Sequence, residues 1–179
     1  RLVLDECFVQ FLTSGEEASM QLETGRFRYL FVLQAFTKIY AVPGIRLGYG
    51  ISSDKALLER METVRQPWSV STPAQAAGLS ALKEDHREEQ TRQLVKSERE
   101  RMEKELENLR IEYIPSEANF LLFNSEINWF EELKKRGILI RDCANYRGLG
   151  NGWYRLAVRL PEENDRLLEC MKQVLNERS

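Results

Sequence analysis

The fold of this chain is decided by residues 29–49, which read YLFVLQAFTKIYAVPGIRLGY. Residues 29–33 are an apolar run, typical of a parallel-sheet strand buried on both faces. Lys38 follows this run, and the turn signal Pro43-Gly44 precedes Arg46. Ligands of open parallel sheets bind beyond the carboxyl ends of the strands. A lysine there can lose its proton and attack a carbonyl group, and a neighbouring arginine suggests an anion site.

A second apolar run, residues 2–4, ends at Asp5 and Glu6 and predicts another buried strand of the same kind. Asp5 is therefore expected beyond a strand end, as Lys38 is. Taken alone, an aspartate or a lysine at a strand end is more often an ordinary surface residue. The chain also opens at Arg1 inside this expected strand, so we expect it to be a fragment whose N-terminal part is missing.

The sequence around these residues matches a known pattern. Residues 35–38 (AFTK) and 43–49 (PGIRLGY) resemble the Ser-x-Thr/Ser-Lys … Pro-Gly-x-Arg-x-Gly-Tyr block of fold type I pyridoxal-phosphate enzymes. Residues 4–8 (LDECF) resemble the Asp-Glu-Ala-Tyr/Phe strand end of the same enzymes, in the right order and at the right spacing. The chain is thus similar to the C-terminal half of a class I/II aminotransferase.

This resemblance implies a fold and a cofactor. The expected fold is α/β: the C-terminal part of a pyridoxal-phosphate (PLP) transferase large domain, with a mostly parallel sheet and helices, followed by a small α+β C-terminal domain. We expect residues 1–83 to belong to the large domain and residues 84–179 to the small domain, which includes a long linking helix. The expected cofactor is pyridoxal 5′-phosphate, and the parent enzyme is expected to be a homodimer.

The resemblance also assigns roles to individual residues. Lys38 would hold the cofactor as a Schiff base and move the proton at the substrate carbon. Asp5 would pair with the pyridine nitrogen, because an adjacent carboxylate favours a protonated ring, which is the better electron sink. Arg46 would bind the cofactor phosphate with Thr37 close by, and Phe8 would contact the cofactor.

Two residues would bind the substrate. Arg155 would bind its carboxylate, because a planar guanidinium pairs with a carboxylate through two hydrogen bonds. Arg141 would supply a second anion contact. The period of two over residues 153–159 places Arg155 on the face opposite to Tyr154, Leu156 and Val158.

The chain departs from the family pattern at two positions. Ala35 stands where a serine usually binds phosphate, so one hydrogen bond is lost. Phe8 stands where many members have a tyrosine that contacts the ring oxygen of the cofactor. The glycine/serine phosphate cup and the stacking aromatic belong to the N-terminal half of the family. We therefore expect the isolated chain to be inactive and to bind the cofactor weakly or not at all.

The remaining pattern predicts mostly helices and short strands. Helices are expected over 54–64 with an N-cap at Ser52 or Ser53, over 73–82, over 83–110, over 129–136 and from Pro161. Strands are expected over 45–51, 119–123, 138–141 and 153–159, and residues 14–24 show weak helical spacing. The charged helix over 83–110 has one narrow apolar stripe, which favours a solvated helix over a sheet rather than a coiled-coil partner site. That stripe consists of Val95, Met102, Leu106 and Leu109.

Composition excludes several classes of function. The 26 basic and 28 acidic residues give a net charge of −2, so no charge excess drives binding to nucleic acid or to a membrane. The single histidine, His86, excludes most structural zinc sites and most nucleophile systems that need histidine, and we expect no metal. The three scattered cysteines favour a reducing compartment, and a cytoplasmic location is expected. The segment Gly148-Leu149-Gly150-Asn151-Gly152 precedes an expected strand, so it is interpreted as a turn rather than a dinucleotide loop.

Three interpretations of function stay open. Several C-terminal segments carry a further resemblance, namely residues 140–143, 145–146, 148–149 and 154–159. Together with Phe8 and residues 66–70 (QPWSV), they resemble threonine-phosphate decarboxylases of cobalamin synthesis more than histidinol-phosphate aminotransferases. The leading hypothesis is therefore decarboxylation of L-threonine O-3-phosphate to an aminopropanol phosphate. The alternatives are a histidinol-phosphate-type aminotransferase and a non-catalytic domain that has kept the fold.

Overall fold

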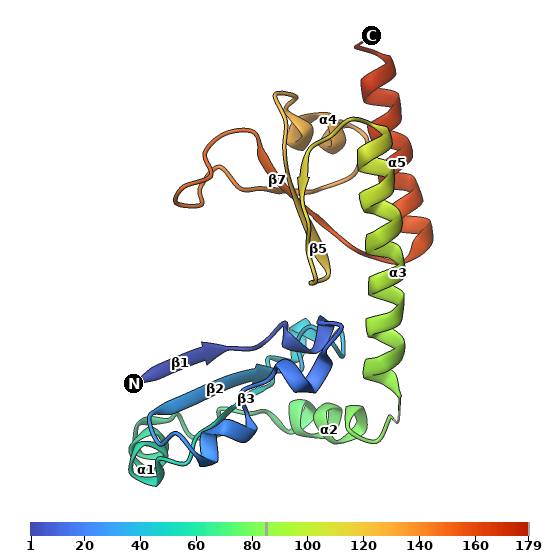
Figure 1. Ribbon diagram of the computed structural model, residues 1–179. Helices are drawn as coiled ribbons and strands as arrows, with labels where there is room; N and C mark the ends of the chain where they lie inside the picture. Colours follow the sequence, from blue (N-terminus) through green and yellow to red (C-terminus); the bar gives the residue numbers. More distant parts are fainter. Residues whose placement is uncertain (85, 179) are drawn as a thin grey trace. The chain divides into compact units, whose positions relative to one another are not determined.

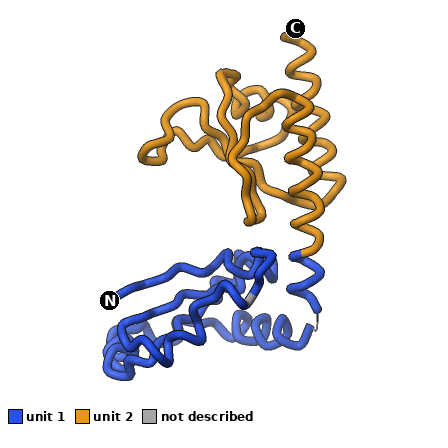
Figure 2. Tube along the Cα trace, in the orientation of Figure 1, with its two compact units in different colours: residues 1–92 blue, residues 93–179 orange. Residues whose placement is uncertain are grey.

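The computed structural model describes residues 1–84 and 86–178. The chain forms two compact units, unit 1 (residues 1–92) and unit 2 (residues 93–179), coloured separately in Figure 2. The division falls inside one long helix, α3 (Arg87–Asn108). The assignment of residues 1–83 and 84–179 to the two domains of the family stays a prediction.

Unit 1 contains a three-stranded sheet in the order β1-β2-β3, with its strands side by side in Figure 1. The strands are β1 (Leu2–Asp5), β2 (Leu30–Ala35) and β3 (Gly48–Ile51). β1 and β2 are parallel, while β3 is antiparallel to β2. The parallel pairing places the carboxyl ends of β1 and β2 at the same edge of the sheet.

Burial differs between the two parallel strands. Most of β2 is buried, including Leu30, Phe31 and Val32, as the apolar run predicts. The same expectation for residues 2–4 is wrong, because Leu2 and Val3 are each 56% exposed. In the described parts of the chain β1 lies at the edge of the sheet, with β2 as its only partner.

Tertiary contacts decide where the helices of unit 1 begin. α1 (Lys55–Val64) is capped by the Asp54 carboxylate, which accepts a hydrogen bond from the Leu57 amide at 3.2 Å. The predicted cap at Ser52 or Ser53 is wrong. The Ser52 hydroxyl instead donates to the Leu30 carbonyl on β2 at 2.9 Å. The next helix, α2 (Thr72–Ala81), is capped by Ser71, close to the predicted start.

Short 3-10 turns replace two of the expected elements. The weak helical spacing over 14–24 becomes two such turns, and the strand expected over 45–51 begins only at Gly48. The strand is shorter because η4 occupies Pro43–Ile45 and Arg46 has a positive φ of 58°, neither of which is compatible with extended pairing. The other turns of this type are η1 (Val9–Phe11), η2 (Gly15–Ala18) and η3 (Leu22–Gly25).

Unit 2 contains an antiparallel four-stranded sheet in the order β4-β5-β7-β6. Its strands are β4 (Tyr113–Ile114), β5 (Phe120–Asn124), β6 (Arg141–Asp142) and β7 (Trp153–Ala157). Its further helices are α4 (Trp129–Lys135) and α5 (Pro161–Asn176). The strand predicted over 138–141 is wrong for residues 138–140, because β6 begins only at Arg141.

The part of α3 in unit 2 packs beside α5 (Figure 1). Two ion pairs join the helices, Arg101 to Asp165 at 2.6 Å and Lys172 to Glu105 at 2.5 Å. The predicted stripe of α3 lies largely in the core of unit 2, where Met102 is fully buried. This favours the interpretation of α3 as a solvated helix that covers its own sheet.

Two structural features are absent from the described residues. No helix there combines the length and the apolar character needed to cross a membrane. No group of three or more histidine, cysteine or acidic side chains is arranged to hold a metal ion in the same parts of the chain.

Candidate active site

Asp5 and Lys38 both lie at the carboxyl-end edge of the unit 1 sheet. Asp5 is the last residue of β1 and is the partner of Leu33 on β2. Lys38 lies in the loop that continues from β2. Both side chains are exposed, so this edge offers a carboxylate and an amine to a ligand.

Phe8 links the loop that follows β1 to the loop that follows β2. The Lys38 ammonium lies over the Phe8 ring, 5.2 Å from its centroid. A cation in this position is attracted by the negative face of the ring. Because Phe8 follows the end of β1 and Lys38 follows β2, this contact brings the two loops together.

Cys7 completes the group. Its amide donates a hydrogen bond to Asp5 Oδ1 at 3.0 Å, and its thiol also donates to Asp5. These two bonds hold the pKa of Asp5 below its ordinary value. Burial and the neighbouring Asp5 carboxylate raise the pKa of Cys7 to about 11, against an opposing effect of the Lys38 charge. We call Asp5, Cys7, Phe8 and Lys38 the strand-end cluster.

Arg46 lies in the loop between η4 and β3. Its guanidinium is exposed and donates to the Pro43 carbonyl at 3.1 Å, and its backbone is left-handed with φ 58°. Thr37 precedes Lys38 directly and is half-buried, while Ala35 ends β2 without a hydroxyl group. The sequence predicts Arg46 and Thr37 for the phosphate, and this role stays a prediction.

A second candidate site lies on the sheet of unit 2. Arg141 on β6 and Arg155 on β7 are direct partners in the antiparallel pairing. Directly opposite residues of an antiparallel pair point to the same face, so the two arginines share a face. The prediction for β7 is confirmed, since Tyr154, Leu156 and Val158 are buried while Arg155 is half-exposed.

An aromatic ring lies beside each guanidinium. That of Arg155 is 5.0 Å from the ring centroid of Phe120, and that of Arg141 is 5.6 Å from that of Tyr146. Arg141 also donates to Asn145 Oδ1 at 3.0 Å. Within residues 1–84 and 86–178, no carboxylate forms an ion pair with either arginine. Two opposed cations of this kind repel each other, and an anion on their shared face removes that cost.

The glycine-rich segment before β7 forms turns, as the sequence predicts. Gly148, Gly150 and Gly152 have φ values of 93°, 79° and 86°, a region that side chains rarely adopt. A Cβ atom on Gly152 would also lie 2.8 Å from the Ser125 carbonyl oxygen. These glycines shape the chain between Arg141 and Arg155, and the segment joins no strand to a helix.

Sequence reasoning missed two residues at the edge of the unit 1 sheet. Cys7 stands at the alanine position of the family pattern, and that difference was a usable signal. Glu6 is only 8% exposed although it lies between two residues of the cluster, and three hydrogen-bond donors surround it. Nothing in the local sequence indicates that Glu6 is buried.

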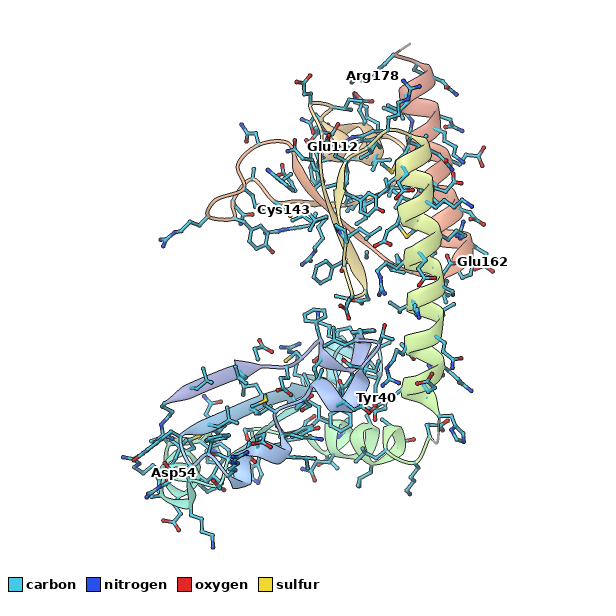
Figure 3. All side chains as sticks on the ribbon, viewed as in Figure 1. Tyr40, Asp54, Glu112, Cys143, Glu162 and Arg178 are labelled. Atoms are coloured by element: carbon cyan, nitrogen blue, oxygen red, sulfur yellow. The ribbon has the colours of Figure 1, made fainter. Side chains whose placement is uncertain are left out.

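A further polar contact lies elsewhere in unit 1. The Tyr40 hydroxyl donates to Glu88 at 2.5 Å, and Tyr40 stacks on Phe36. Burial is the largest cause that raises the pKa of Tyr40, followed by its bond to Glu88. Figure 3 shows Tyr40 and Asp54 at opposite ends of this unit. The Tyr40–Glu88 hydrogen bond therefore stabilises the end of unit 1 opposite to Asp54, the residue that caps α1 (Figure 3).

Comparison with known proteins identifies the family. Residues 1–170 match the family described as aminotransferase class I and II. The chain belongs to this family. The sequence prediction of the family is confirmed, and enzymes of this family use pyridoxal 5′-phosphate.

Two curated relatives are equally similar in sequence. The chain is 37% identical over 178 residues to threonine-phosphate decarboxylase from Salmonella typhimurium, covering 97% of this chain and 48% of the relative. It is also 37% identical over 175 residues to histidinol-phosphate aminotransferase 1 from Archaeoglobus fulgidus, covering 97% of this chain and 52% of the relative. The chain spans about half the length of the curated relatives it matches.

Solved structures confirm the predicted fold class. The histidinol-phosphate aminotransferase from Clostridium acetobutylicum superposes with a TM-score of 0.91 at 31% identity, over 98% of this chain and 54% of that one. The L-threonine-O-3-phosphate decarboxylase from Porphyromonas gingivalis gives 0.83 at 26% identity, over 97% and 55%. The fold is therefore that of part of a PLP-transferase.

Proposed function

We propose that this chain is part of a PLP-dependent enzyme that acts on a small phosphorylated substrate. The residues of unit 1 fit the cofactor: Lys38 offers an amine, Asp5 a carboxylate and Arg46 an exposed guanidinium. These groups match the aldehyde, the pyridine nitrogen and the phosphate of pyridoxal phosphate in chemistry. The bound cofactor supplies an electron sink that weakens one bond at the α-carbon of an amino acid.

The state of Asp5 supports its role. Hydrogen bonds from Cys7 lower the pKa of Asp5, so this carboxylate is ionised at neutral pH. An ionised Asp5 can hold a proton on a ring nitrogen. Phe8 and Cys7 keep the carboxylate and the Lys38 amine at one edge of the sheet, so both can reach the same bound molecule.

Lys38 is the proposed base at the substrate carbon. Its amine is exposed and makes no ion pair within the described parts of the chain, so no carboxylate competes for it. Arg46 and Thr37 are the proposed phosphate contacts. Because Ala35 has no hydroxyl group, Arg46 carries a larger share of phosphate binding here than in relatives with a serine at that position.

The opposed pair Arg141 and Arg155 is the observation that carries the substrate class. Two guanidinium groups on one face, each beside an aromatic ring and neither paired with a carboxylate of the described residues, fit a substrate with two anionic groups. Arg155 is the proposed partner of the substrate carboxylate, and Arg141 supplies the second anion contact.

The proposed reaction is decarboxylation of L-threonine O-3-phosphate to an aminopropanol phosphate. The similarity to threonine-phosphate decarboxylase from Salmonella typhimurium supports it. A role in cobalamin biosynthesis is part of the same proposal. The proposal includes a homodimeric enzyme in the cytoplasm. The alternative is a histidinol-phosphate-type aminotransferase. The similarity to the Archaeoglobus fulgidus relative and to the Clostridium acetobutylicum structure supports this alternative.

The carboxylate contact distinguishes the two reactions. The bound cofactor would weaken the bond to the carboxylate in decarboxylation and the C–H bond in transamination. The groups that orient the carboxylate, Arg155 first among them, therefore select the product.

The test supplies each substrate to the full-length protein. One sample receives threonine phosphate, and release of carbon dioxide is measured. A second receives histidinol phosphate with 2-oxoglutarate, and glutamate is measured. Carbon dioxide in the first sample supports the decarboxylase. Glutamate in the second without carbon dioxide in the first would replace it with the aminotransferase, and neither product would overturn both.

A further inference from the structure

The side chain of Glu6 is buried directly beyond Asp5, although the proposed chemistry does not use it. It is 8% exposed. Its Oε2 accepts hydrogen bonds from the Ser19 hydroxyl at 2.6 Å and from Gln34 Nε2 at 3.0 Å, and its Oε1 accepts from the Met20 amide at 2.8 Å. A buried carboxylate needs such donors, because water no longer solvates it.

The proton positions of two partners follow from their other contacts. The Ser19 hydroxyl accepts a hydrogen bond from the Gln21 amide at 3.2 Å, which leaves its own proton for Glu6. Gln34 is 4% exposed, and its Oε1 has no hydrogen-bond partner within the described residues. Leaving a buried oxygen without a hydrogen bond costs free energy. The side-chain amide of Gln34 is therefore oriented by the bond from its Nε2 to Glu6, because that orientation leaves its Oε1 without a donor.

These bonds tie together the segments that carry the strand-end cluster. Glu6 follows Asp5, and its amide extends the β1–β2 pairing by donating to the Leu33 carbonyl at 2.9 Å. Gln34 lies on β2, the strand that leads to Lys38. The loop at residues 19–20 closes over the same carboxylate. Within the described residues β1 pairs with β2 alone, and the Glu6 bonds add to this pairing at the carboxyl end of β1.

We propose that Glu6 is a positioning residue, whose buried carboxylate fixes the end of β1 and thereby the placement of Asp5 relative to Lys38. This role rests on the proposed function, since it matters only where Asp5 and Lys38 serve one bound molecule. It predicts that a change at Glu6 alters the site without touching substrate or cofactor.

The first experiment needs no cofactor. Amide hydrogen exchange is measured on the full-length, cofactor-free wild-type protein and on its Glu6→Gln variant. The new side-chain amide places an N–H donor where Ser19, Met20 and Gln34 already donate, so at least one of their hydrogen bonds is lost. The Met20 and Cys7 amides should exchange about ten-fold faster in the variant. Asp54→Asn is the matched control, because Asp54 is also a buried carboxylate of unit 1 but bonds Arg1 just before β1 begins. Unchanged exchange in Glu6→Gln, or an equal change in Asp54→Asn, would overturn the proposal.

The second experiment follows the absorbance of the cofactor bound at Lys38 as a function of pH. A displaced Asp5 supports a protonated ring less well, so less positive charge opposes protonation of the Lys38 linkage. The midpoint should therefore rise by about half a pH unit or more in Glu6→Gln, and stay unchanged in Asp54→Asn.

A double variant tests the tie between the strands. Glu6→Gln with Gln34→Glu exchanges donor and acceptor, and the midpoint should return toward that of the wild type. A midpoint that does not move in Glu6→Gln would overturn the positioning role. Wild-type protein without cofactor on Lys38 would instead refute the proposed function, and the exchange experiment would still decide whether Glu6 holds the end of β1.

Discussion

Replacing Arg155 with lysine tests the substrate-binding face of unit 2. The change keeps one positive charge but removes the planar guanidinium that lies over Phe120 and opposite Arg141. A lysine ammonium cannot make two parallel hydrogen bonds to one carboxylate. Arg155→Lys therefore loses at least one charge-assisted contact with the substrate.

The size of the effect follows from that lost contact. A hydrogen bond to a charged group contributes about 1.5–3 kcal/mol, which corresponds to a fall of about 10- to 150-fold in kcat/KM. Arg155 is half-exposed, so water screens part of the interaction and favours the lower part of this range. KM should rise and kcat should fall together if Arg155 also orients the carboxylate.

The assay is steady-state kinetics of the full-length enzyme with its preferred substrate. Arg159→Lys is the matched control, because Arg159 follows β7 but is already paired with Glu163 at 2.7 Å. It should leave kcat/KM nearly unchanged. An equal, small effect of both changes would refute the placement of the substrate carboxylate at Arg155.

Three further predictions concern other residues. With a pKa of about 11, the Cys7 thiol stays protonated at pH 8, so iodoacetamide should modify it more slowly in the folded protein than in the unfolded chain. Asp5→Asn should raise the rate of modification of the folded protein, because it removes the carboxylate that holds the thiol proton. A lower rate of modification in Asp5→Asn than in the wild type would contradict this. A hydrogen bond from Arg1 lowers the pKa of Asp54, so the stability that Asp54 contributes is complete above its unfolded pKa of about 4 and is lost as the pH falls through its folded pKa. Asp54→Asn should therefore lose less stability on acidification than the wild type. An identical dependence of stability on pH in the two proteins would refute this. Met102→Ala should lower the free energy of unfolding by about 2–5 kcal/mol in urea titration, because Met102 is fully buried, whereas Leu109→Ala, at a half-exposed position of the same stripe, should cost much less.

Much of the site could be predicted because short patterns encode it. The apolar run over 29–33 predicts β2, and the lysine after it falls at the sheet edge where ligands bind. The period of two in β7 correctly places Arg155 away from the core. These features depend on residues close together in sequence, where side-chain direction follows directly from the backbone.

The rest depends on contacts between distant segments. Ser52 does not cap α1 because its hydroxyl bonds the Leu30 carbonyl, so Asp54 caps instead. Glu6 is buried because its donors come from a loop and from β2, which no local period can indicate. The opposition of Arg141 and Arg155 depends on the register of a strand only two residues long.

The central claim is that Lys38 carries the cofactor, and one measurement tests it most directly. The full-length protein is loaded with pyridoxal phosphate, reduced with borohydride, digested and examined by mass spectrometry. The reduced adduct should lie on the peptide that contains Lys38, and Lys38→Arg should carry none. An adduct on a different lysine, or no adduct in the loaded wild-type protein, would contradict the account.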